Sequence, residues 1–192
     1  LVVLNPTAGR GKCARLRHRI EHGLRDAGVK YELVETTGPG HALGIALEAA
    51  GRGITKLLCA GGDGTVHEAA NGLLQSPLAD DGATRVALGV IPAGTGDDFA
   101  KLVNVYRLPP EAAAARMARA EVARFDVGKV EGEYFDNVLG IGFDAEAVRH
   151  ALKIRRLKGI LVYLAAIYRT FVTFRPPVLE VVSAEHTETS AM

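Results

Sequence analysis

The sequence predicts an α/β domain in which a mostly parallel sheet carries helices on both faces. Short apolar runs alternate along the first half of the chain with longer segments whose apolar residues recur every three or four positions. Three of these runs are followed directly by glycine-rich loops. Strands separated by helices pair in parallel, and a chain of 192 residues with 48% hydrophobic residues can bury a core.

The elements of this first domain are predicted from their local patterns, in chain order. The opening run is apolar, and in the next segment Leu16, Ile20 and Leu24 fall on one helical face. Residues 31–35 alternate as a half-buried strand does, and residues 41–50 are rich in alanine, a strong helix former. Two continuous apolar runs then fit buried strands. The predicted strands are residues 1–4, 31–35, 56–60 and 86–91, and the predicted helices are residues 12–27, 41–50, 65–74 and 111–120.

The pattern changes near residue 121, where a second, β-rich domain is predicted to begin. Residues 122–130 and 134–141 resemble strands, and only the turn Glu131-Gly132-Glu133 separates them, as in an antiparallel hairpin. Residues 178–183 are the last predicted strand, and polar residues follow them. We therefore expect an α/β domain over residues 1–121 and a partial second domain over residues 122–192, truncated at its C-terminus. Because the chain starts inside a strand-like run, its N-terminus is expected to be trimmed.

The charge balance argues against nucleic acid as a partner. Lysine and arginine total 23 against 22 acidic residues, a formal net charge of +1, which leaves no surplus for binding a polyanion. Cys13 and Cys59 lie in helical or apolar contexts without metal-ligand spacing. They are expected to be reduced thiols of a cytosolic protein.

Each glycine-rich loop follows a predicted strand: residues 5–12 (NPTAGRGK), 61–65 (GGDGT) and 93–98 (AGTGDD). In an open parallel sheet, loops at the carboxyl ends of the strands converge where ligands bind. Glycine lets the backbone approach a ligand closely, and free N–H groups at a helix start attract an anion. Three such loops predict a nucleotide phosphate site. The first is not a P-loop, because Cys13 stands where serine or threonine would follow the lysine.

Asp63, in the second loop, is the candidate catalytic residue. A carboxylate there would repel a polyphosphate unless a cation lay between them, so Asp63 indicates magnesium, which binds few carboxylates together with waters and phosphate oxygens. Asp97, Asp98 and Asp126 could join such a cluster. Structural explanations also remain open: Asp98 could cap a helix over residues 99–102, and Asp126 could be a turn or strand-end residue.

The residues around these glycines complete an ordered set of motifs. They are Asn5-Pro6-x-x-Gly9; Gly61-Gly62-Asp63-Gly64-Thr65 with Glu68 and Asn71-Gly72; Pro92-x-Gly94-Thr95-Gly96-x-Asp98-Phe99; Phe125-Asp126-Val127-Gly128; and Phe135-x-Asn137 with Gly140-x-Gly142-Phe143-Asp144. The set resembles the diacylglycerol kinase catalytic-domain family, which includes bacterial diacylglycerol and YegS-like lipid kinases, sphingosine kinases and ceramide kinases. The Gly-Gly-Asp-Gly loop by itself is shared with NAD kinases and phosphofructokinase-like proteins.

The resemblance implies a fold and an activity. Members have an NAD-kinase/phosphofructokinase-like nucleotide-binding domain followed by an antiparallel β-sandwich. The implied reaction transfers the γ-phosphate of ATP, as co-substrate, to a hydroxyl of a diacylglycerol-like or sphingoid lipid in phospholipid biosynthesis, with Mg²⁺ as cofactor. The positions that match the family's ATP contacts are Asn5, Pro6, Thr7, Ala8, Gly9, Thr36, Gly61, Gly62, Asp63, Gly64, Thr65, Val66, His67, Gly94, Thr95 and Gly96. The acidic positions that organise the magnesium match Asp63, and Asp98 and Asp126 through water.

Two departures from the family pattern leave alternatives open. Asp97 stands where the family usually has asparagine, which removes an amide donor and adds charge beside the phosphates. The family's acidic general base and direct magnesium ligands lie in the later part of the β-domain, and no residue after Ser183 is expected to supply them, so the base is expected outside this chain. The alternatives to a lipid kinase are an NAD kinase-like enzyme and a nucleotide-binding fragment without catalytic competence.

A basic segment, residues 149–158, contains five lysines or arginines and no acid, and it precedes the apolar residues 159–174. Arg169 interrupts the apolar segment, which is too short and too charged to span a membrane. The basic run could contact anionic headgroups while the helix lines an acyl-chain groove. Alternatively, it is a solvated segment before an ordinary core helix. The predicted location is cytoplasmic, with peripheral contact at the inner membrane surface.

Overall fold

The structure is a computed structural model that describes residues 1–79, 86–154, 160–176, 178–182 and 187–191. The chain divides into two compact units, Leu1–Asn137 and Val138–Met192. The first unit contains the parallel sheet and all three glycine-rich loops.

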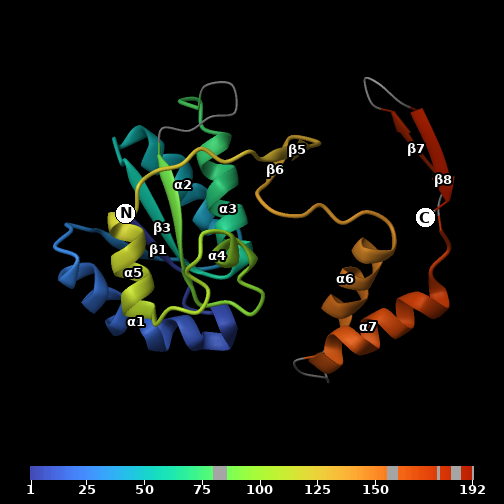
Figure 1. The fold of residues 1–192 in the computed structure, drawn as a ribbon, viewed down its shortest axis with the longest axis horizontal. Helices are drawn as coiled ribbons and strands as arrows, with labels where there is room; N and C mark the ends of the chain where they lie inside the picture. The colour runs from blue at the N-terminus through green and yellow to red at the C-terminus, as the bar shows by residue number, and fades with distance from the viewer. Residues whose placement is uncertain (80–85, 155–159, 177, 183–186, 192) are drawn as a thin grey trace. The chain divides into compact units, whose positions relative to one another are not determined.

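The first unit is a four-stranded parallel sheet with helices on both faces, as the sequence predicts (Figure 1). The strands are β1 (Val2–Leu4), β2 (Leu33–Glu35), β3 (Lys56–Gly61) and β4 (Ala87–Pro92), in the spatial order β2-β1-β3-β4. The helices are α1 (Ala8–Asp26), α2 (His41–Gly51), α3 (Asp63–Leu74), α4 (Asp98–Leu102) and α5 (Pro110–Arg119). Each predicted strand of the parallel sheet, and each predicted helix that covers it, forms close to its predicted bounds.

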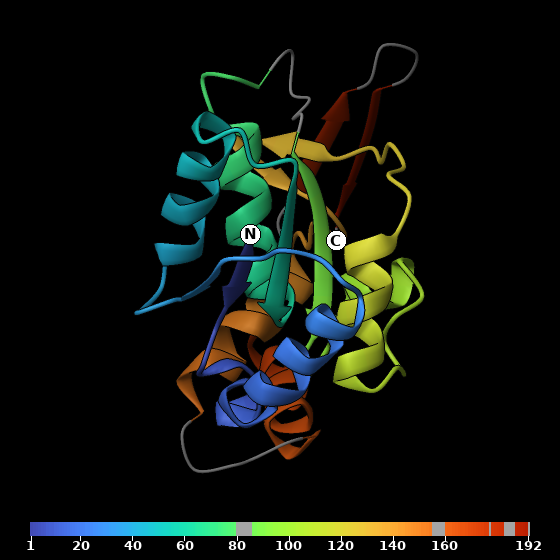
Figure 2. The same cartoon turned by 90° about the vertical axis from the view of Figure 1, so that its left-hand side faces the viewer.

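Two layers of helices cover the sheet. Helices α1 and α5 pack together on one face, and α2 and α3 pack together on the other (Figure 2). Val3, Leu4, Leu57 and Ile91 of the strands are fully buried between these layers. The strand order reverses between β1 and β3, because β2 lies on one side of β1 and β3 on the other. Such a switch point opens a crevice between the loops that leave the two strands.

Both cysteines are free thiols buried in this core. Cys13 of α1 donates its thiol hydrogen to the carbonyl of Ala60 at 3.2 Å, and Cys59 lies within β3. Burial raises the pKa of the Cys13 thiol to about 12, and burial also raises the pKa of Cys59. Both thiols are therefore protonated and unreactive in the folded chain.

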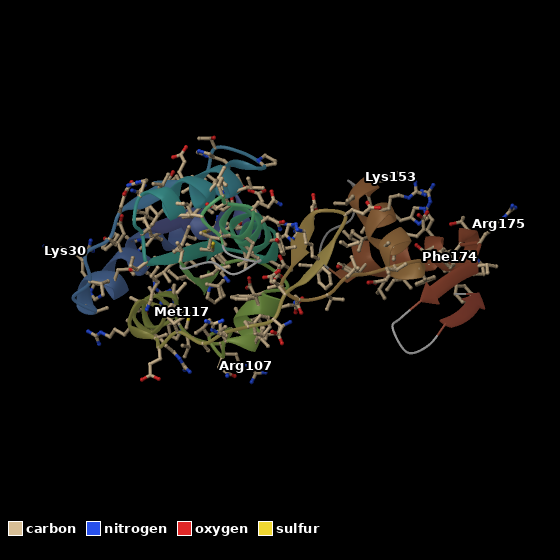
Figure 3. All side chains as sticks on the ribbon, turned by 90° about the horizontal axis from the view of Figure 1, so that it is seen from above. Lys30, Arg107, Met117, Lys153, Phe174 and Arg175 are labelled. Atoms are coloured by element: carbon tan, nitrogen blue, oxygen red, sulfur yellow. The ribbon has the colours of Figure 1, made fainter. Side chains whose placement is uncertain are left out.

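Helices α2 and α3 approach each other closely at Gly72. A Cβ atom at Gly72 would lie 2.2 Å from the carbonyl oxygen of Leu43 in α2. On the other face of the sheet, Met117 of α5 is buried over Gly89 of β4 (Figure 3). The glycine at position 72 is therefore what lets α2 and α3 pack this closely.

The predicted antiparallel hairpin forms from β5 (Gly128–Val130) and β6 (Glu133–Phe135), and it lies beside α3 (Figure 1). Glu131 and Gly132 have φ values of 48° and 90°, the positive values that a two-residue type I′ turn requires. The strands are shorter than predicted, because within the described chain residues 122–127 and 136–141 pair with no strand. The hairpin belongs to the first compact unit, which extends to Asn137. The domain boundary after residue 121 stays a prediction.

In its described residues, the second unit contains two helices and a second antiparallel strand pair. Its elements are α6 (Phe143–Lys153), α7 (Ile160–Thr173), β7 (Val178–Val182) and β8 (Thr187–Ala191). The rings of Phe143 and Phe174 meet edge to face, with centroids 5.5 Å apart, where α6 packs beside α7 (Figure 3). The second link between the two helices is polar: His150 Nδ1 lies 2.9 Å from Thr170 Oγ1.

The second unit differs from its sequence prediction in two elements. Helix α6 is missing from the prediction because its buried residues are Ala147 and His150, which make no long apolar stripe. The prediction that residues 178–183 are the last strand is wrong, because β8 pairs with β7 through its backbone despite its polar sequence. Helix α7 falls in the predicted apolar segment, whereas Arg155, Arg156 and Lys158 lie outside the described residues. Within the described ranges, no helix has the length and apolar character needed to cross a bilayer.

Substitution of Gly72 tests the close approach of α2 and α3. In Gly72→Ala the new Cβ would collide with backbone, which cannot rotate away, and overpacking of this kind lowers the unfolding free energy by about 1 to 3 kcal/mol. Gly44→Ala in α2 is the matched control, because nothing lies within 4 Å of a Cβ at that position. The control should gain about 0.5 to 1 kcal/mol from helix propensity. Urea unfolding measures both variants, and equal stability of the two would contradict the close contact.

Candidate functional site

The three glycine-rich loops meet at the carboxyl edge of the sheet, beside the switch point between β1 and β3. The first loop follows β1, the second follows β3 and opens α3, and the third follows β4 and opens α4. Direct contacts join each loop to the other two. Packing between the loops therefore fixes their arrangement.

Asn5 joins the first loop to the second. Its Nδ2 donates to Thr65 Oγ1 at 3.0 Å, and its Oδ1 accepts the N–H and the hydroxyl of Thr7 at 3.1 and 2.8 Å. The bonds to Thr7 close a local turn of the kind that asparagine favours. Thr65, which receives the other bond, is 5% exposed. Asn5 thus holds the first loop against the first turn of α3.

The first loop ends in three consecutive left-handed residues. Gly9, Arg10 and Gly11 have φ values of 58°, 59° and 81°, and regular helix continues from Lys12, where the sequence predicts its start. A Cβ at Gly9 would lie 2.3 Å from the carbonyl oxygen of Ala93, so glycine is required where the first loop passes the third. Turns of this kind present backbone N–H groups to an anion.

The second and third loops touch through their glycine backbones. A Cβ at Gly94 would lie 2.5 Å from Gly62 Cα, which leaves no room for a side chain between the two loops. The N–H of Ala93 donates to the carbonyl of Gly61 at 2.9 Å and continues the pairing of β3 with β4. The two loops leave the sheet as one packed layer.

Asp63 is the first residue of α3, and its carboxylate reaches the third loop. Oδ1 accepts the backbone N–H of Asp98 at 2.7 Å and that of Phe99 at 3.2 Å, so Asp63 caps the N-terminus of α4. Capping of this helix by Asp98, one of the explanations that the sequence left open for that residue, does not occur, because the cap comes from a residue 35 positions earlier. The Asp98 carboxylate pairs instead with Lys101 Nζ, 2.6 Å away on the surface of α4.

Asp97 is a buried carboxylate in the third loop, 6% exposed and with a φ of 50°. Its Oδ1 accepts the N–H of Gly94 at 2.8 Å. Burial raises the pKa of the Asp97 carboxyl and the charge of Asp63 adds to the rise, against the lowering effects of Gly94, Lys12 and Lys101. An asparagine here would accept the same hydrogen bond without a buried charge, and asparagine tolerates a positive φ well.

Two carboxylate oxygens flank Gly96. A Cβ at Gly96 would lie 2.8 Å from Asp63 Oδ2 and 3.4 Å from Asp98 Oδ2, so both oxygens border the space that a side chain would fill. Both hydrogen bonds that Asp63 accepts in the described chain reach its Oδ1. Among the described residues, no group of three or more His, Cys, Asp or Glu side chains could hold a metal. One or two carboxylate oxygens beside a phosphate site fit Mg²⁺, which completes its shell with water and phosphate.

Asp126, the third carboxylate implied for magnesium, is exposed in the segment between α5 and β5. The neighbouring Phe125 contacts Phe99 of α4 edge to face, with ring centroids 6.4 Å apart. This aromatic pair anchors the segment that carries Asp126 to α4.

The other residues implied as ATP contacts differ in how they can reach a ligand. Thr36 is buried, and its N–H donates to the carbonyl of Leu4 at the end of β1. Val66 is fully buried, so its side chain belongs to the core. The buried positions are Thr36, Gly61, Thr65 and Val66; the half-exposed or exposed positions are Asn5, Pro6, Thr7, Ala8, Gly9, Gly62, Asp63, Gly64, His67, Gly94, Thr95 and Gly96.

Two residues of α3 hold neighbouring elements in place, a role that sequence reasoning does not assign to them. Glu68 accepts the N–H groups of Gly40 and Ala42 at 2.9 and 3.2 Å, and thereby caps α2. Asn71 binds the backbone of Tyr134 in β6. One signal was available: α2 follows a glycine and begins without a capping side chain of its own, which indicates a cap from elsewhere in the chain.

Asp97→Asn is expected to stabilise the protein, increasingly so as the pH rises. Folding raises the pKa of Asp97 above its ordinary value of 3.8, so the folded chain binds this proton more tightly than the unfolded chain. The resulting stabilisation is complete below the ordinary pKa and is lost as the pH rises through the folded-state pKa. Asparagine does not titrate and avoids the loss. Thermal unfolding from about pH 4 to about pH 8 measures the difference between variant and wild type.

Asp98→Asn is the control for this prediction. It removes the same charge from a neighbouring carboxylate whose side chain is 53% exposed and paired with Lys101, so no gain in stability is expected. If the gain in stability of Asp97→Asn over wild type decreased as the pH rose, the raised pKa of Asp97 would be contradicted.

Comparison with known proteins agrees with this geometry. Residues 1–130 match the family described as the diacylglycerol kinase catalytic domain. The chain is 33% identical over 181 residues to a diacylglycerol kinase of Bacillus subtilis, an alignment that covers 94% of this chain and 58% of that protein. It is 30% identical over 182 residues to sphingoid long-chain bases kinase 1 of Arabidopsis thaliana, covering 89% of this chain and 23% of that protein.

A crystal structure of a diacylglycerol kinase from Bacillus anthracis is similar to the whole chain. The TM-score is 0.72 at 26% sequence identity, over 99% of this chain and 60% of that one. The chain thus spans less than two thirds of the length of these relatives. The family match extends over 130 of 192 residues, from β1 into β5. The chain therefore belongs to the diacylglycerol kinase catalytic domain family.

Proposed function

We propose that this chain is the nucleotide-binding part of a lipid kinase that transfers the γ-phosphate of ATP to a lipid hydroxyl, with Mg²⁺ as cofactor. The observation that carries the proposal is the position of Asp63, a carboxylate at the point where three packed glycine loops meet. The loops offer N–H donors to phosphate, and the carboxylate suits the accompanying cation. Relatives named as diacylglycerol and sphingoid-base kinases support a lipid as acceptor.

The phosphates of ATP would lie across the starts of α1 and α3. A helix N-terminus carries partial positive charge, and the Asn5–Thr65 hydrogen bond joins the beginnings of these two helices. Lys12, exposed just after the left-handed turn, adds a full positive charge. Asp63, with Asp98 and Asp126 acting through water, would hold Mg²⁺. When bound, this ion neutralises the charge on the phosphate oxygens during transfer.

The transfer forms a bond between the lipid hydroxyl oxygen and the γ-phosphorus. It breaks the bond between that phosphorus and the oxygen that leaves with ADP. The hydroxyl proton would pass to a general base, which the family resemblance implies lies outside this chain. The residues of this chain position the phosphates and balance their charge, which is the larger part of what phosphoryl transfer requires from a protein.

Calorimetric titration with ATP, with and without Mg²⁺, tests the proposal. Asp63→Asn keeps an oxygen for the N–H groups of α4 but loses the charge, so it separates capping from cation binding. This variant should weaken magnesium-dependent binding about tenfold or more, because interactions with charged groups contribute about 1.5 to 3 kcal/mol. Asp26→Asn, on a carboxylate 63% exposed at the end of α1, is the matched control and should bind as wild type does.

The same titration with NAD separates lipid kinases from NAD kinase-like enzymes. Binding of NAD without binding of ATP would reject the proposal, as would ATP binding that needs neither Mg²⁺ nor Asp63. Phosphorylation assays on the full-length protein with a diacylglycerol and a sphingoid base then identify the acceptor. A full-length protein that binds ATP but phosphorylates neither lipid would be a nucleotide-binding protein without this activity.

Peripheral contact with an anionic membrane is part of the proposal, and the second unit supports it. Helix α7 contains no acidic residue and one base, Arg169, and its Tyr168 and Phe171 are 72% and 79% exposed. Lys153 and Arg175 are exposed bases of the same unit (Figure 3). Apolar side chains enter the membrane interface while nearby bases meet anionic headgroups.

Replacement of both Arg155 and Arg156 by alanine tests this contact. Each base near an anionic surface contributes about 1 kcal/mol, so the loss of two should cost about 2 kcal/mol, and the double variant should bind phosphatidylserine vesicles about thirtyfold more weakly in a sedimentation assay. The control replaces Lys30 and Arg107, two exposed bases of the first unit, and changes the net charge equally (Figure 3). Equal binding of wild type and the Arg155/Arg156 variant would exclude a contribution from this segment.

A further inference from the structure

The loop that joins β2 to α2, residues 36–40 and termed here the β2–α2 loop, lies at the same sheet edge as the glycine-rich loops, because β2 runs parallel to β1. Its first residue, Thr36, donates its N–H to the carbonyl of Leu4, at the end of β1, at 2.9 Å. Its last residue, Gly40, donates its N–H to Glu68 of α3 at 2.9 Å. The β2–α2 loop is therefore joined at both ends to elements that form the candidate phosphate site.

His41, the first residue of α2, fixes the middle of this loop. The backbone N–H of Thr37 donates to His41 Nδ1 at 3.0 Å, and Thr37 Oγ1 lies 3.1 Å from the same nitrogen. A backbone N–H only donates, so Nδ1 must carry a lone pair and the ring hydrogen must be on Nε2. The contact therefore requires the neutral, Nε2-protonated form of the ring.

The groups around His41 act on a charged ring in opposite directions. The N-terminus of α2 carries partial positive charge and disfavours a second positive charge there. The Glu68 carboxylate of α3 favours it, since it accepts the N–H groups of the two residues on either side of His41. Glu35, at the end of β2, is paired with Arg17 of α1, and Glu48 lies about two turns further along α2. Neither effect alters the hydrogen-bond requirement, because a proton on Nδ1 removes the acceptor that the loop N–H needs.

We propose that His41 is a positioning residue whose neutral ring holds the β2–α2 loop in the conformation that binds nucleotide, so that protonation of the ring weakens ATP binding. A proton on Nδ1 sets two N–H groups against each other, and the ring and the Thr37 backbone must separate. Histidine is the side chain whose ordinary charge change falls between about pH 5 and 8. ATP affinity should therefore fall as the pH falls through this range.

The coupling follows from the position of the loop. Ligands of an open parallel sheet bind beyond the carboxyl ends of its strands, where this loop lies. ATP shifts the loop between its two arrangements only as far as it binds one of them more tightly. The regulation rests on the proposed function, whereas the hydrogen bond between His41 and Thr37 does not.

Nuclear magnetic resonance of the ring nitrogens tests the hydrogen bond without any ligand. At about pH 8, His41 Nδ1 should give the signal of an unprotonated nitrogen and Nε2 that of a protonated one. During acidification the amide signal of Thr37 should shift with the same midpoint as the ring, because protonation breaks their bond. His41→Ala should abolish this shift. A ring protonated on Nδ1 at about pH 8, or a Thr37 amide that does not follow the ring, would overturn the hydrogen bond.

The regulation is measured as the ratio of the ATP dissociation constants, with Mg²⁺ present, at about pH 5.5 and about pH 8. Other groups of the protein and ATP itself also change charge in this range, so the wild-type ratio is compared with that of His41→Ala. The variant lacks the acceptor at every pH, so it should bind ATP about threefold to tenfold more weakly than wild type at the higher pH and equally at the lower pH. The wild-type ratio should therefore be about threefold to tenfold larger.

His18→Ala is the matched control, because His18 is exposed on α1 and the substitution also replaces one histidine by alanine. Its ratio should stay within about twofold of wild type. If His41 had only a structural role, His41→Ala would weaken ATP binding by the same factor at both pH values. Melting temperatures at both pH values confirm that each comparison is made on folded protein.

The outcomes of the two measurements are distinguishable. Equal ratios in wild type and His41→Ala would overturn the regulation, and the ring nitrogen signals would still decide on the hydrogen bond. A wild-type protein that binds no ATP at either pH would refute the proposed function and the regulation together. An overturned hydrogen bond would remove the physical basis of the regulation and leave the proposed function intact.

Discussion

Helix α3 satisfies backbone groups of three other elements with its own side chains, and the arrangement of the site depends on this. Asp63 caps α4, Glu68 caps α2, and Asn71 pairs with β6. Backbone N–H groups at helix starts need partners, and neither α2 nor α4 has a side-chain cap from its own N-cap residue. The helix that follows the Gly-Gly-Asp-Gly loop therefore sets the positions of the elements around the proposed phosphate site.

The same contacts explain how Asp63 can serve both structure and chemistry. Its Oδ1 is fixed by two N–H groups of α4, and this fixes the direction of Oδ2, which borders the space above Gly96. A carboxylate held in this way loses little rotational freedom when it binds a cation. Structural capping and cation binding therefore make compatible demands on one side chain.

The sequence predicts the parts of this site that depend on local pattern. The strands, the three loops and the hairpin turn follow from apolar runs, glycines and the Glu131-Gly132 pair, all of which act within a few residues. Glu68 and Asp63 are 28 and 35 positions away in sequence from the backbone N–H groups that they cap. No local sequence pattern indicates contacts over such separations. Asp98 satisfies the local rule for an N-cap, yet the cap of this helix comes from Asp63, which no local rule would indicate. Strand β8 was not predicted because its polar residues show no strand pattern. It forms through backbone pairing with β7.

The burial of the two thiols gives the chain its own reporters of local opening. Alkylating reagents attack the thiolate, so they modify Cys13 or Cys59 only after the surrounding structure opens. Cys13 spans the seam between α1 and the end of β3, whereas Cys59 lies inside β3. The alkylation rate of Cys13 therefore reports how often α1 separates from the sheet. The alkylation rate of Cys59 reports how often the sheet itself opens around β3. A nucleotide that stabilised the loops at this edge of the sheet would lower the alkylation rate of Cys13 more than that of Cys59. Both rates can be measured on the native sequence, without an added probe.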